Sequence, residues 1–168
     1  MQFLKVEEKD FGEVYRQMEE SFPICERREY QEAKEVLKEK DYNLFHIEDD
    51  GKRVGFISVW ALDGFFFIEH FAVYPDFRNK GLGATALELA KKQFKSLVLE
   101  AEPPISDFAI RRLAFYERNG FCKNSFKYFQ PAYREGEDDV ELVILSYPSL
   151  IEREEQVIKE IYKKVYAR

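Results

Sequence analysis

A six-residue segment, Arg78-Asn79-Lys80-Gly81-Leu82-Gly83, has the composition of an anion-binding loop. Two glycines separated by one residue let the backbone turn tightly, so that successive N–H groups converge on one point. The helix expected to start at Gly83 adds the partial positive charge of its N-terminus there. Arg78 and Lys80 bring two cationic side chains beside it. The spacing therefore predicts a local site for an anion such as a pyrophosphate.

The same six residues also allow a simpler interpretation, in which Gly-Leu-Gly only turns the chain and the two cations are solvated. The loop is not a P-loop, because G-x-x-x-x-G-K-[ST] is absent, and it lacks the third glycine of a G-x-G-x-x-G dinucleotide-binding loop. The chain has 168 residues and a formal net charge of −6. Broad electrostatic binding of nucleic acid is therefore not expected, and an anion must bind through a local device.

The cysteines and the apolar runs predict where the protein works. Cys25 and Cys122 have no C-x-x-C spacing and no adjacent histidine, so we expect free thiols, no metal and a reducing compartment. The N-terminal segment is charged throughout and has no apolar core of a secretory signal. The longest uncharged apolar run, residues 54–62, is too short to span a bilayer, which takes about 20 residues. We expect a cytoplasmic protein with no membrane partner.

The elements that position the loop follow from the hydrophobic pattern, because helices repeat apolar residues every three or four positions and strands alternate them or run continuously. The expected strands are residues 3–6, 42–48, 52–62, 65–73, 97–101, 121–129 and 140–147. The expected helices are residues 11–22, 29–40, 83–94, 107–119 and 149–166. With no repeat, linker or break in composition, this order predicts one mixed α/β domain over residues 1–168.

Helix starts and turns carry their own signals in the sequence. Asp10 with Glu13, and Ser149 with Glu152, have the spacing of capping boxes. Ser106 or Asp107 is expected to cap the fourth helix, whose end is marked by Asn119-Gly120. Asp49-Asp50-Gly51 predicts a tight turn between two strands of a hairpin.

Two segments resemble the GNAT N-acetyltransferase superfamily. The stretch FAVYPDFRNKGLGATALELAKK, from Phe71 to Lys92, is similar to its acetyl-CoA signature: a strand ending in apolar-x-Val-x-Pro, then [Arg/Gln]-x-x-Gly-x-[Gly/Ala], then a helix. The stretch LAFYERNGF, from Leu113 to Phe121, is similar to the later motif, in which a helix ending in Tyr-x-x-x-Gly-Phe leads into a strand. The resemblance spans about a third of the chain, and two motifs in the right order are far more specific than either alone.

This resemblance implies an α/β fold with a single mixed, mostly antiparallel central sheet and helices on both faces. It also implies acetyl-CoA as cosubstrate, with the pyrophosphate held by the backbone of Arg78, Asn79, Lys80, Gly81, Leu82, Gly83 and Ala84. The strand before the loop is expected to carry a bulge and to splay from its neighbour. The backbone of Phe71, Ala72 and Val73 would then pair with the pantetheine arm, and an N–H there would polarise the thioester carbonyl.

The tyrosine of the later motif is Tyr116 in this chain, and the resemblance implies that it protonates the departing CoA thiolate. The alternative is an aromatic packing residue in a chain with 10 Tyr and 16 Phe. Many members of the superfamily have an Asn seven residues before this tyrosine, where this chain has Ala109. A side-chain contact to the cofactor is expected to be absent there.

A base is required because an amine with a pKa near 10 is mostly protonated at neutral pH and cannot attack a thioester. Glu69 is the candidate: it precedes the expected bulge, has apolar neighbours, and by strand alternation shares a face with Phe71 and Val73. The alternative is a salt-bridged or edge-exposed carboxylate. His70 is expected to face the other way, and both His70 and His46 are expected to be structural.

Two further segments bear on substrate and assembly. The acidic loop Glu135–Asp139 would border the acceptor site by the resemblance and could favour a cationic amine, although a solvated charge run is the simpler interpretation. The terminal helix has an apolar stripe that must be covered by the protein's own sheet or by a second subunit, so a monomer or a homodimer is possible. The stripe comprises Leu150, Ile151, Val157, Ile158, Ile161, Tyr162 and Val165.

The sequence therefore favours an acetyl-CoA-dependent N-acetyltransferase that moves acetyl to a primary amine of a small molecule by direct attack, with Glu69 or a water chain as base and Tyr116 as acid. Two alternatives remain open. One is an acyl-CoA-binding sensor or regulatory module without efficient catalysis, and the other is a peptide or protein N-acetyltransferase. No metal and no nucleic acid are expected to take part.

Overall fold

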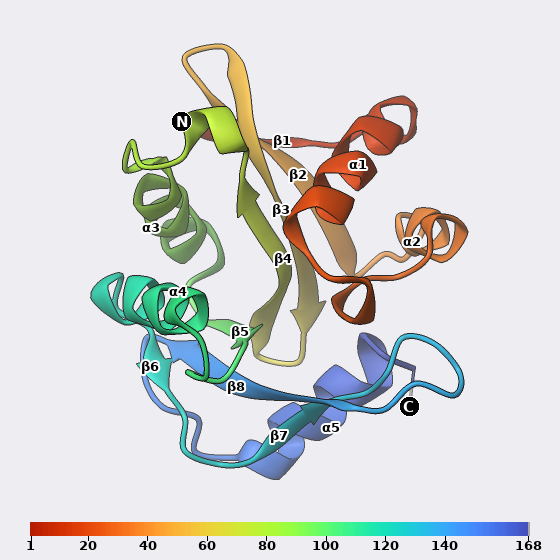
Figure 1. Ribbon diagram of the computed structural model, residues 1–168, viewed down its shortest axis with the longest axis vertical. Helices are drawn as coiled ribbons and strands as arrows, with labels where there is room; N and C mark the ends of the chain where they lie inside the picture. Colours follow the sequence, from red (N-terminus) through yellow and green to blue (C-terminus); the bar gives the residue numbers. More distant parts are fainter. Residues whose placement is uncertain (168) are drawn as a thin grey trace.

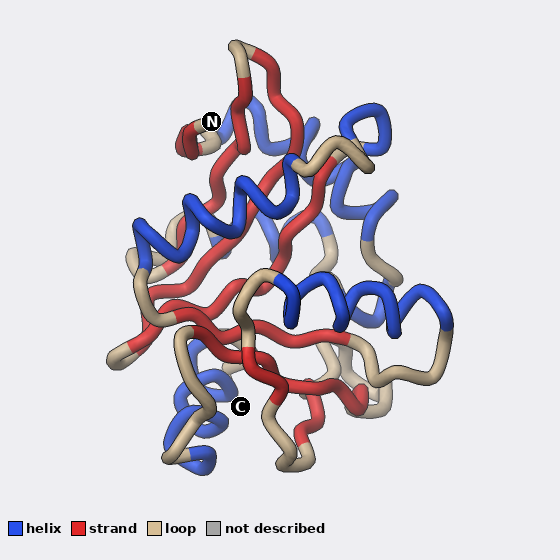
Figure 2. The backbone as a smooth tube through the Cα atoms, turned by 90° about the vertical axis from the view of Figure 1, so that its left-hand side faces the viewer, coloured by secondary structure: helices blue, strands red, loops and turns tan. Residues whose placement is uncertain are grey.

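The computed structural model describes residues 1–167, whose strands form a sheet with helices on both faces (Figures 1 and 2). The strands are β1 (Gln2–Lys5), β2 (Tyr42–Asp49), β3 (Lys52–Leu62), β4 (Phe65–Val73), β5 (Leu97–Ala101), β6 (Cys122–Lys123), β7 (Tyr128–Gln130) and β8 (Val140–Tyr147). The helices are α1 (Phe11–Ser21), α2 (Tyr30–Val36), α3 (Leu82–Phe94), α4 (Asp107–Arg118) and α5 (Glu154–Lys164). Short 3₁₀ turns at Glu8–Asp10, Ile24–Glu26 and Pro75–Phe77 complete the order.

The sheet has the order β1-β2-β3-β4-β5-β8-β6, with β7 paired to β8. Among the strand pairs of residues 1–167, β4 with β5 is parallel and every other pair is antiparallel. Parallel neighbours need a crossover, which α3 supplies. The expected mixed, mostly antiparallel sheet is therefore confirmed, and the single parallel pair lies at its centre.

Two hydrophobic cores lie on the two faces of the sheet. One contains side chains of α1 and α5, such as Val14 and Ile161, together with Phe67 of β4. The other contains side chains of α3 and α4, such as Leu87 and Leu113. Figure 1 shows α3 and α4 on the opposite side of β4 from α1 and α2. The expected helices on both faces of the sheet are therefore confirmed.

The helix caps differ from the expected capping boxes. Asp10 is the N-cap of α1 but makes no capping hydrogen bond. Instead Asp10 and Glu13 both accept from Arg53, at 3.0 and 3.3 Å, because the β2–β3 hairpin brings that guanidinium between them. The box expected at Ser149 is also wrong, since α5 begins five residues later. Ser106 does cap α4, with its Oγ accepting from Ala109 N at 3.1 Å.

The strand expected at residues 121–129 is split into β6 and β7. Asn124 lies at the break, where its amide group donates to Ile144 O at 3.2 Å and to Ser146 Oγ at 2.9 Å. Its Oδ1 accepts from Ile151 N at 2.9 Å. A side chain bonded to both β8 and the segment before α5 replaces the ladder between strands, which is why one expected strand becomes two.

The apolar stripe of the terminal helix is covered by the protein's own sheet. Ile161 and Val165 are buried, and four more of its members pack against the same core: Ile151, Val157, Ile158 and Tyr162. Leu150 is more than half exposed. Of the two covers expected for this stripe, the protein's own sheet and a second subunit, the structure has the first. None of the helices within residues 1–167 has the length and apolar character needed to cross a bilayer.

Candidate functional site

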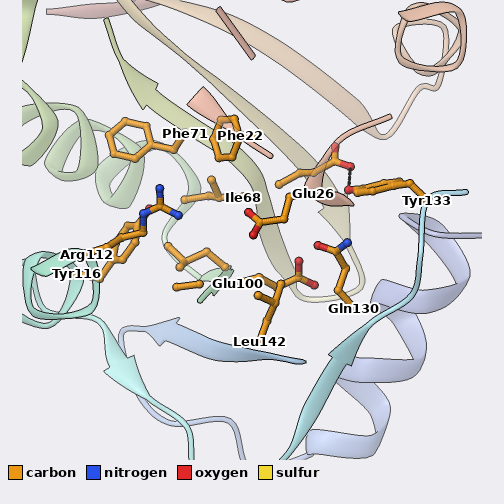
Figure 3. A pocket seen from close by; sticks show the side chains of 13 residues that line it. Phe22, Glu26, Ile68, Phe71, Glu100, Arg112, Tyr116, Gln130, Tyr133 and Leu142 are labelled. Carbon is orange, nitrogen blue, oxygen red and sulfur yellow. Dashed lines mark hydrogen bonds between the residues drawn. The ribbon is translucent and has the colours of Figure 1, made fainter. Parts of the chain in front are cut away.

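The site is built where β4 and β5 separate. Their pairing ends at Ile68 and Leu99, although β4 continues to Val73. The register between β3 and β4 shifts at the same level: Val59 pairs with Ile68 and Ser58 with His70, so Glu69 is an extra residue, a β-bulge. A cavity of about 40 Å³ lies in the gap (Figure 3). The bulge and splay expected in this strand are both present.

The bulge turns two consecutive side chains to one face of the sheet. Ile68 and Phe71 belong to the core under α3 and α4, whereas Glu69 and His70 both point to the opposite face. There His70 packs edge-on against Phe22 and its Nε2 lies 3.0 Å from Glu26 O. The expectation that His70 faces away from Glu69 is wrong, because strict alternation fails across a bulge. The two side chains are 4.0 Å apart.

Beyond the bulge, one edge of β4 has no strand beside it. Tyr74 N donates to Val54 O at 2.9 Å, which fixes the phase of the ladder with β3. In an antiparallel ladder alternate residues bond to the partner, so Phe71 and Val73 direct their N–H and C=O groups to the open edge and Ala72 bonds to β3. Val73 O accepts from Arg78 Nε at 2.9 Å. The open edge can therefore accept an extended chain.

The predicted anion loop lies at the end of this edge and opens α3. Asn79 and Gly81 have left-handed backbones, with φ of 61° and 77°, which turn the chain sharply into the helix. The first helical bond is from Thr85 N to Gly81 O, so the N–H groups of Leu82, Gly83 and Ala84 have no acceptor in the helix. These groups point at one place, as an anion requires.

The basic side chains of the loop and its second glycine have distinct roles. Arg78 bonds to Val73 O, while Lys80 Nζ donates to Asp76 O at 2.8 Å and lies over the Phe77 ring. Both cations are thus folded against the loop. A Cβ added at Gly83 would lie 3.2 Å from the ring of Phe115, so the close packing of α3 on α4 favours glycine there.

Tyr116 lines the cavity from α4 (Figure 3). Its ring packs edge-on against Phe121, with centroids 5.8 Å apart. Burial raises the pKa of the Tyr116 phenol, and the charge of Arg112, one turn earlier, partly offsets that rise. The hydroxyl is therefore protonated at neutral pH and available as a proton donor. Ala109, where a side-chain contact to the cofactor was expected to be absent, is buried in α4.

Glu69 also lines the cavity, but three donors hold its carboxylate. Arg28 forms a buried ion pair with it, Trp60 Nε1 donates at 3.0 Å and Tyr133 OH donates at 2.9 Å. Burial alone would raise the pKa of Glu69, yet Arg28 and His70 and these hydrogen bonds bring the pKa below its ordinary value of 4.5. Glu69 is therefore an anion, and a carboxylate stabilised in this way is a weak base.

Two carboxylates that the sequence analysis did not single out face the same cavity. Glu100 of β5 is half-buried, and loss of solvation raises its pKa to about 8 even though Tyr128 and Tyr166 donate hydrogen bonds to it. Glu26 reaches into the pocket from the segment after α1 (Figure 3). Burial and the charge of Glu102 raise the pKa of Glu26, and Arg112 acts in the opposite sense. The cavity thus holds carboxylates with opposite pKa shifts.

The sequence contained one usable signal for these residues and lacked the rest. Glu100 stands inside the apolar run Leu97–Ala101, where a carboxylate is costly to bury, and that cost marks it as a candidate. Glu26, Arg28 and Gln130 come from segments without a motif. Glu26 and Gln130 reach the cavity, and Arg28 reaches Glu69, only because the segment after α1 folds against β4 while β7 pairs with β8, which no spacing along the chain reveals.

The other candidates lie away from the cavity. His46 is buried between β1 and β3, with neither ring nitrogen hydrogen-bonded in the described chain. In the acidic loop Glu135–Asp139, Asp139 accepts from Ala132 N at 3.0 Å and Glu137 lies 3.7 Å from Arg134. The cavity is instead lined by the residues just before the loop, such as Gln130 and Tyr133. Within residues 1–167, no group of three or more His, Cys, Asp or Glu side chains is placed to hold a metal.

The sequence and the structure are both similar to those of known proteins. A family model described as Acetyltransferase (GNAT) family matches residues 8–121. The putative acetyltransferase YjbC of Bacillus subtilis (strain 168) is 30% identical over 159 residues, which cover 90% of this chain and 80% of that protein. A solved putative acetyltransferase of the GNAT family from Bacteroides thetaiotaomicron superposes with a TM-score of 0.95 at 31% identity, over 100% of this chain and 99% of that one.

A third similarity concerns the fold alone. The ribosomal-protein-S18-alanine N-acetyltransferase of Escherichia coli superposes with a TM-score of 0.63 at 21% identity, over 90% of this chain and 96% of that one. An identity this low does not transfer a substrate. It does show that the two proteins share the overall fold.

The buried pair of Arg28 and Glu69 should dominate the stability of the site. Arg28→Met or Glu69→Gln leaves one buried charge without its partner and should lower the free energy of unfolding by about 3–5 kcal/mol. The double variant should lose less than the two single losses added, because neither charge then remains unpaired. Urea unfolding of the four proteins measures this. Lys38→Met, which breaks the exposed pair with Glu35, is the control and should change stability little.

Glu100 should make stability fall as pH rises. Its pKa is 4.5 when unfolded and about 8 when folded, so its protonated form is favoured by folding, and that contribution is present below pH 4.5 and lost through pH 8. Glu100→Gln cannot ionise, so its stability relative to wild type should increase by a few kcal/mol between about pH 5 and 9. Glu69→Gln is the matched control. Because the pKa of Glu69 is lowered by folding, the stability of this variant relative to wild type should change with pH only in the acidic range. A difference independent of pH for Glu100→Gln would contradict this assignment.

Proposed function

The chain belongs to the GNAT acetyltransferase family, and from that premise we propose that it transfers acetyl from acetyl-CoA to a primary amine of a small molecule by direct attack. The observation that carries the proposal is the cavity between β4 and β5. A buried phenol, carboxylates and the start of the open strand edge line it, and the unpaired N-terminus of α3 follows at the end of the same edge. Each of these groups has a part in an acyl transfer, and they come from separate segments of one domain.

The residues of the loop and the strand edge fit acetyl-CoA, which supplies the acetyl group as a thioester. The unpaired N–H groups of Leu82, Gly83 and Ala84, with the left-handed turn at Asn79 and Gly81, suit the pyrophosphate. Beside them Arg78 and Lys80 add positive charge. The open edge at Phe71 and Val73, with Ala72 between them, suits the pantetheine arm, and its outward N–H groups are donors for a carbonyl oxygen.

The proton transfers are assigned to two groups that face the cavity. Tyr116, kept protonated by burial, is the acid for the leaving thiolate. Glu100, with a pKa of about 8, is better matched than Glu69 to take a proton from an amine, because a base works best when its pKa is near the working pH. We assign Glu69, which the sequence offered as the base, to holding the bulge with Arg28.

A carboxylate placed in the loop should abolish acetyl-CoA binding. Gly81→Glu puts a negative charge beside the unpaired N–H groups, so isothermal titration should show micromolar binding by the wild type and none by the variant. Gly81 has a left-handed backbone, so the substitution also adds strain. Gly136→Glu is the matched control, because Gly136 also has a left-handed backbone and a Cβ there would meet no neighbouring atom. This variant should bind acetyl-CoA as the wild type does. No binding by the wild type would leave the loop as a turn only.

Tyr116→Phe should reduce turnover while leaving cofactor binding intact. Loss of a general acid lowers kcat by about 10²-fold or more, whereas the Kd for acetyl-CoA should stay the same because the ring keeps its packing. Tyr147→Phe is the control, since this ring packs on the same Phe121 and lies outside the cavity. Unchanged turnover in Tyr116→Phe would contradict the assignment. A wild type that binds acetyl-CoA and acetylates no amine would favour the sensor alternative.

A further inference from the structure

The cavity presents several hydrogen-bond acceptors beside its donors, which include the Tyr116 hydroxyl, assigned above to the leaving thiolate, and the Arg112 guanidinium. The acceptors are the carboxylates of Glu26 and Glu100 and the side-chain oxygen of Gln130. Of the two guanidinium groups nearby, Arg28 is paired with Glu69, and Arg112 lies 3.5 Å from Glu102 and stacks on Phe108. A ligand that complements the carboxylates and the amide oxygen of the cavity must therefore supply hydrogen-bond donors and positive charge.

Gln130 presents a hydrogen-bond acceptor to the cavity. The residue is 2% exposed, and its Nε2 donates to Cys25 O at 3.1 Å. That bond fixes the amide, so the oxygen points away from Cys25 and toward the pocket (Figure 3). No donor within residues 1–167 reaches this oxygen. The oxygen is not one of the fully enclosed side-chain atoms that lack a partner, so it is open to the cavity, where water or a ligand supplies its donor.

Glu26 is held in place by its backbone while its carboxylate is free. His70 Nε2 lies 3.0 Å from Glu26 O, and Gln130 bonds to the preceding carbonyl, so β4 and β7 both fix the 3₁₀ turn. In the described chain the Glu26 carboxylate makes no hydrogen bond and no ion pair. The charge of Arg112 acts on this carboxylate without forming an ion pair, so the carboxylate is available to a ligand in the cavity.

This inference rests on the proposed function. We propose that Glu26 and Gln130 bind the ammonium group of the acceptor, opposite Glu100. The acceptor is then an unhindered alkyl amine with no carboxylate near its amino group. An ammonium offers three N–H donors and one positive charge, which match these oxygens. A carboxylate beside the amine would meet Glu26, Glu69 and Glu100. The cavity of about 40 Å³ is small, so we expect it to take the end of an unbranched chain in preference to a branched amine.

The test compares acceptors that differ in charge, using the full-length protein with acetyl-CoA. Wild type should acetylate β-alaninamide and n-butylamine at least about tenfold more efficiently, by kcat/KM, than β-alanine. Glu26→Gln should raise KM for β-alaninamide and n-butylamine by about tenfold or more, with kcat little changed. The ratio of their kcat/KM to that of β-alanine should become smaller. This split between KM and kcat would not follow from a purely structural role.

Two further variants keep the result interpretable. Glu29→Gln changes an exposed carboxylate of the same segment, paired with Arg134, and should leave all constants unchanged. Gln130→Met removes the oxygen and keeps the volume, and should raise the same KM even if Glu26→Gln does not fold. If the wild type acetylates these amines and both variants leave KM and the preference unchanged, the inference is overturned and the proposed function stands. If it binds acetyl-CoA and acetylates none of them, the proposed function fails and takes the inference with it.

Discussion

The buried ion pair between Arg28 and Glu69 is the interaction on which the rest of the site depends. Its guanidinium lies over the Tyr133 ring at 4.8 Å and also donates to Val165 O, so one side chain joins the segment after α1, the bulge of β4, the segment after β7 and the end of α5. Both partners are almost completely buried, which makes the pair costly to break but not by itself stabilising. Its value lies in fixing four separate segments around one cavity.

The bulge that carries Glu69 produces several features of the site at once. One extra residue in β4 ends the pairing with β5 and leaves the strand edge free at Phe71 and Val73. The same residue brings His70 to the face of Glu69, where it can contact the carbonyl of Glu26. The open edge of β4 and the position of the turn that carries Glu26 are therefore both consequences of the bulge. Gly55 supports the arrangement, because a Cβ there would lie 2.3 Å from Ala72 O.

The part of the site that lies within one continuous segment could be predicted from the sequence. Strand β4, the loop at Arg78–Gly83 and helix α3 are adjacent, so their chemistry follows from local backbone rules, and the structure has them within a residue of the expected bounds. Glu26 and Gln130 could not be found in this way, since their position depends on contacts between residues over a hundred positions apart. The direction of His70 failed for a related reason, because alternation does not hold across an irregularity whose length the sequence does not give.

The distribution of charge in the cavity explains why the three carboxylates cannot have the same role. Glu69 has a guanidinium and two further donors, so it is an anion whatever binds. Glu100 has tyrosine hydroxyls but no cation, so burial favours its neutral form until positive charge arrives. Arrival of an ammonium would supply that charge and lower the pKa of Glu100 while the nearby carboxylates hold the cation in place. In the proposed reaction an acceptor of this kind would ionise Glu100 as it binds, which links recognition of the amine to the protonation state of the proposed base.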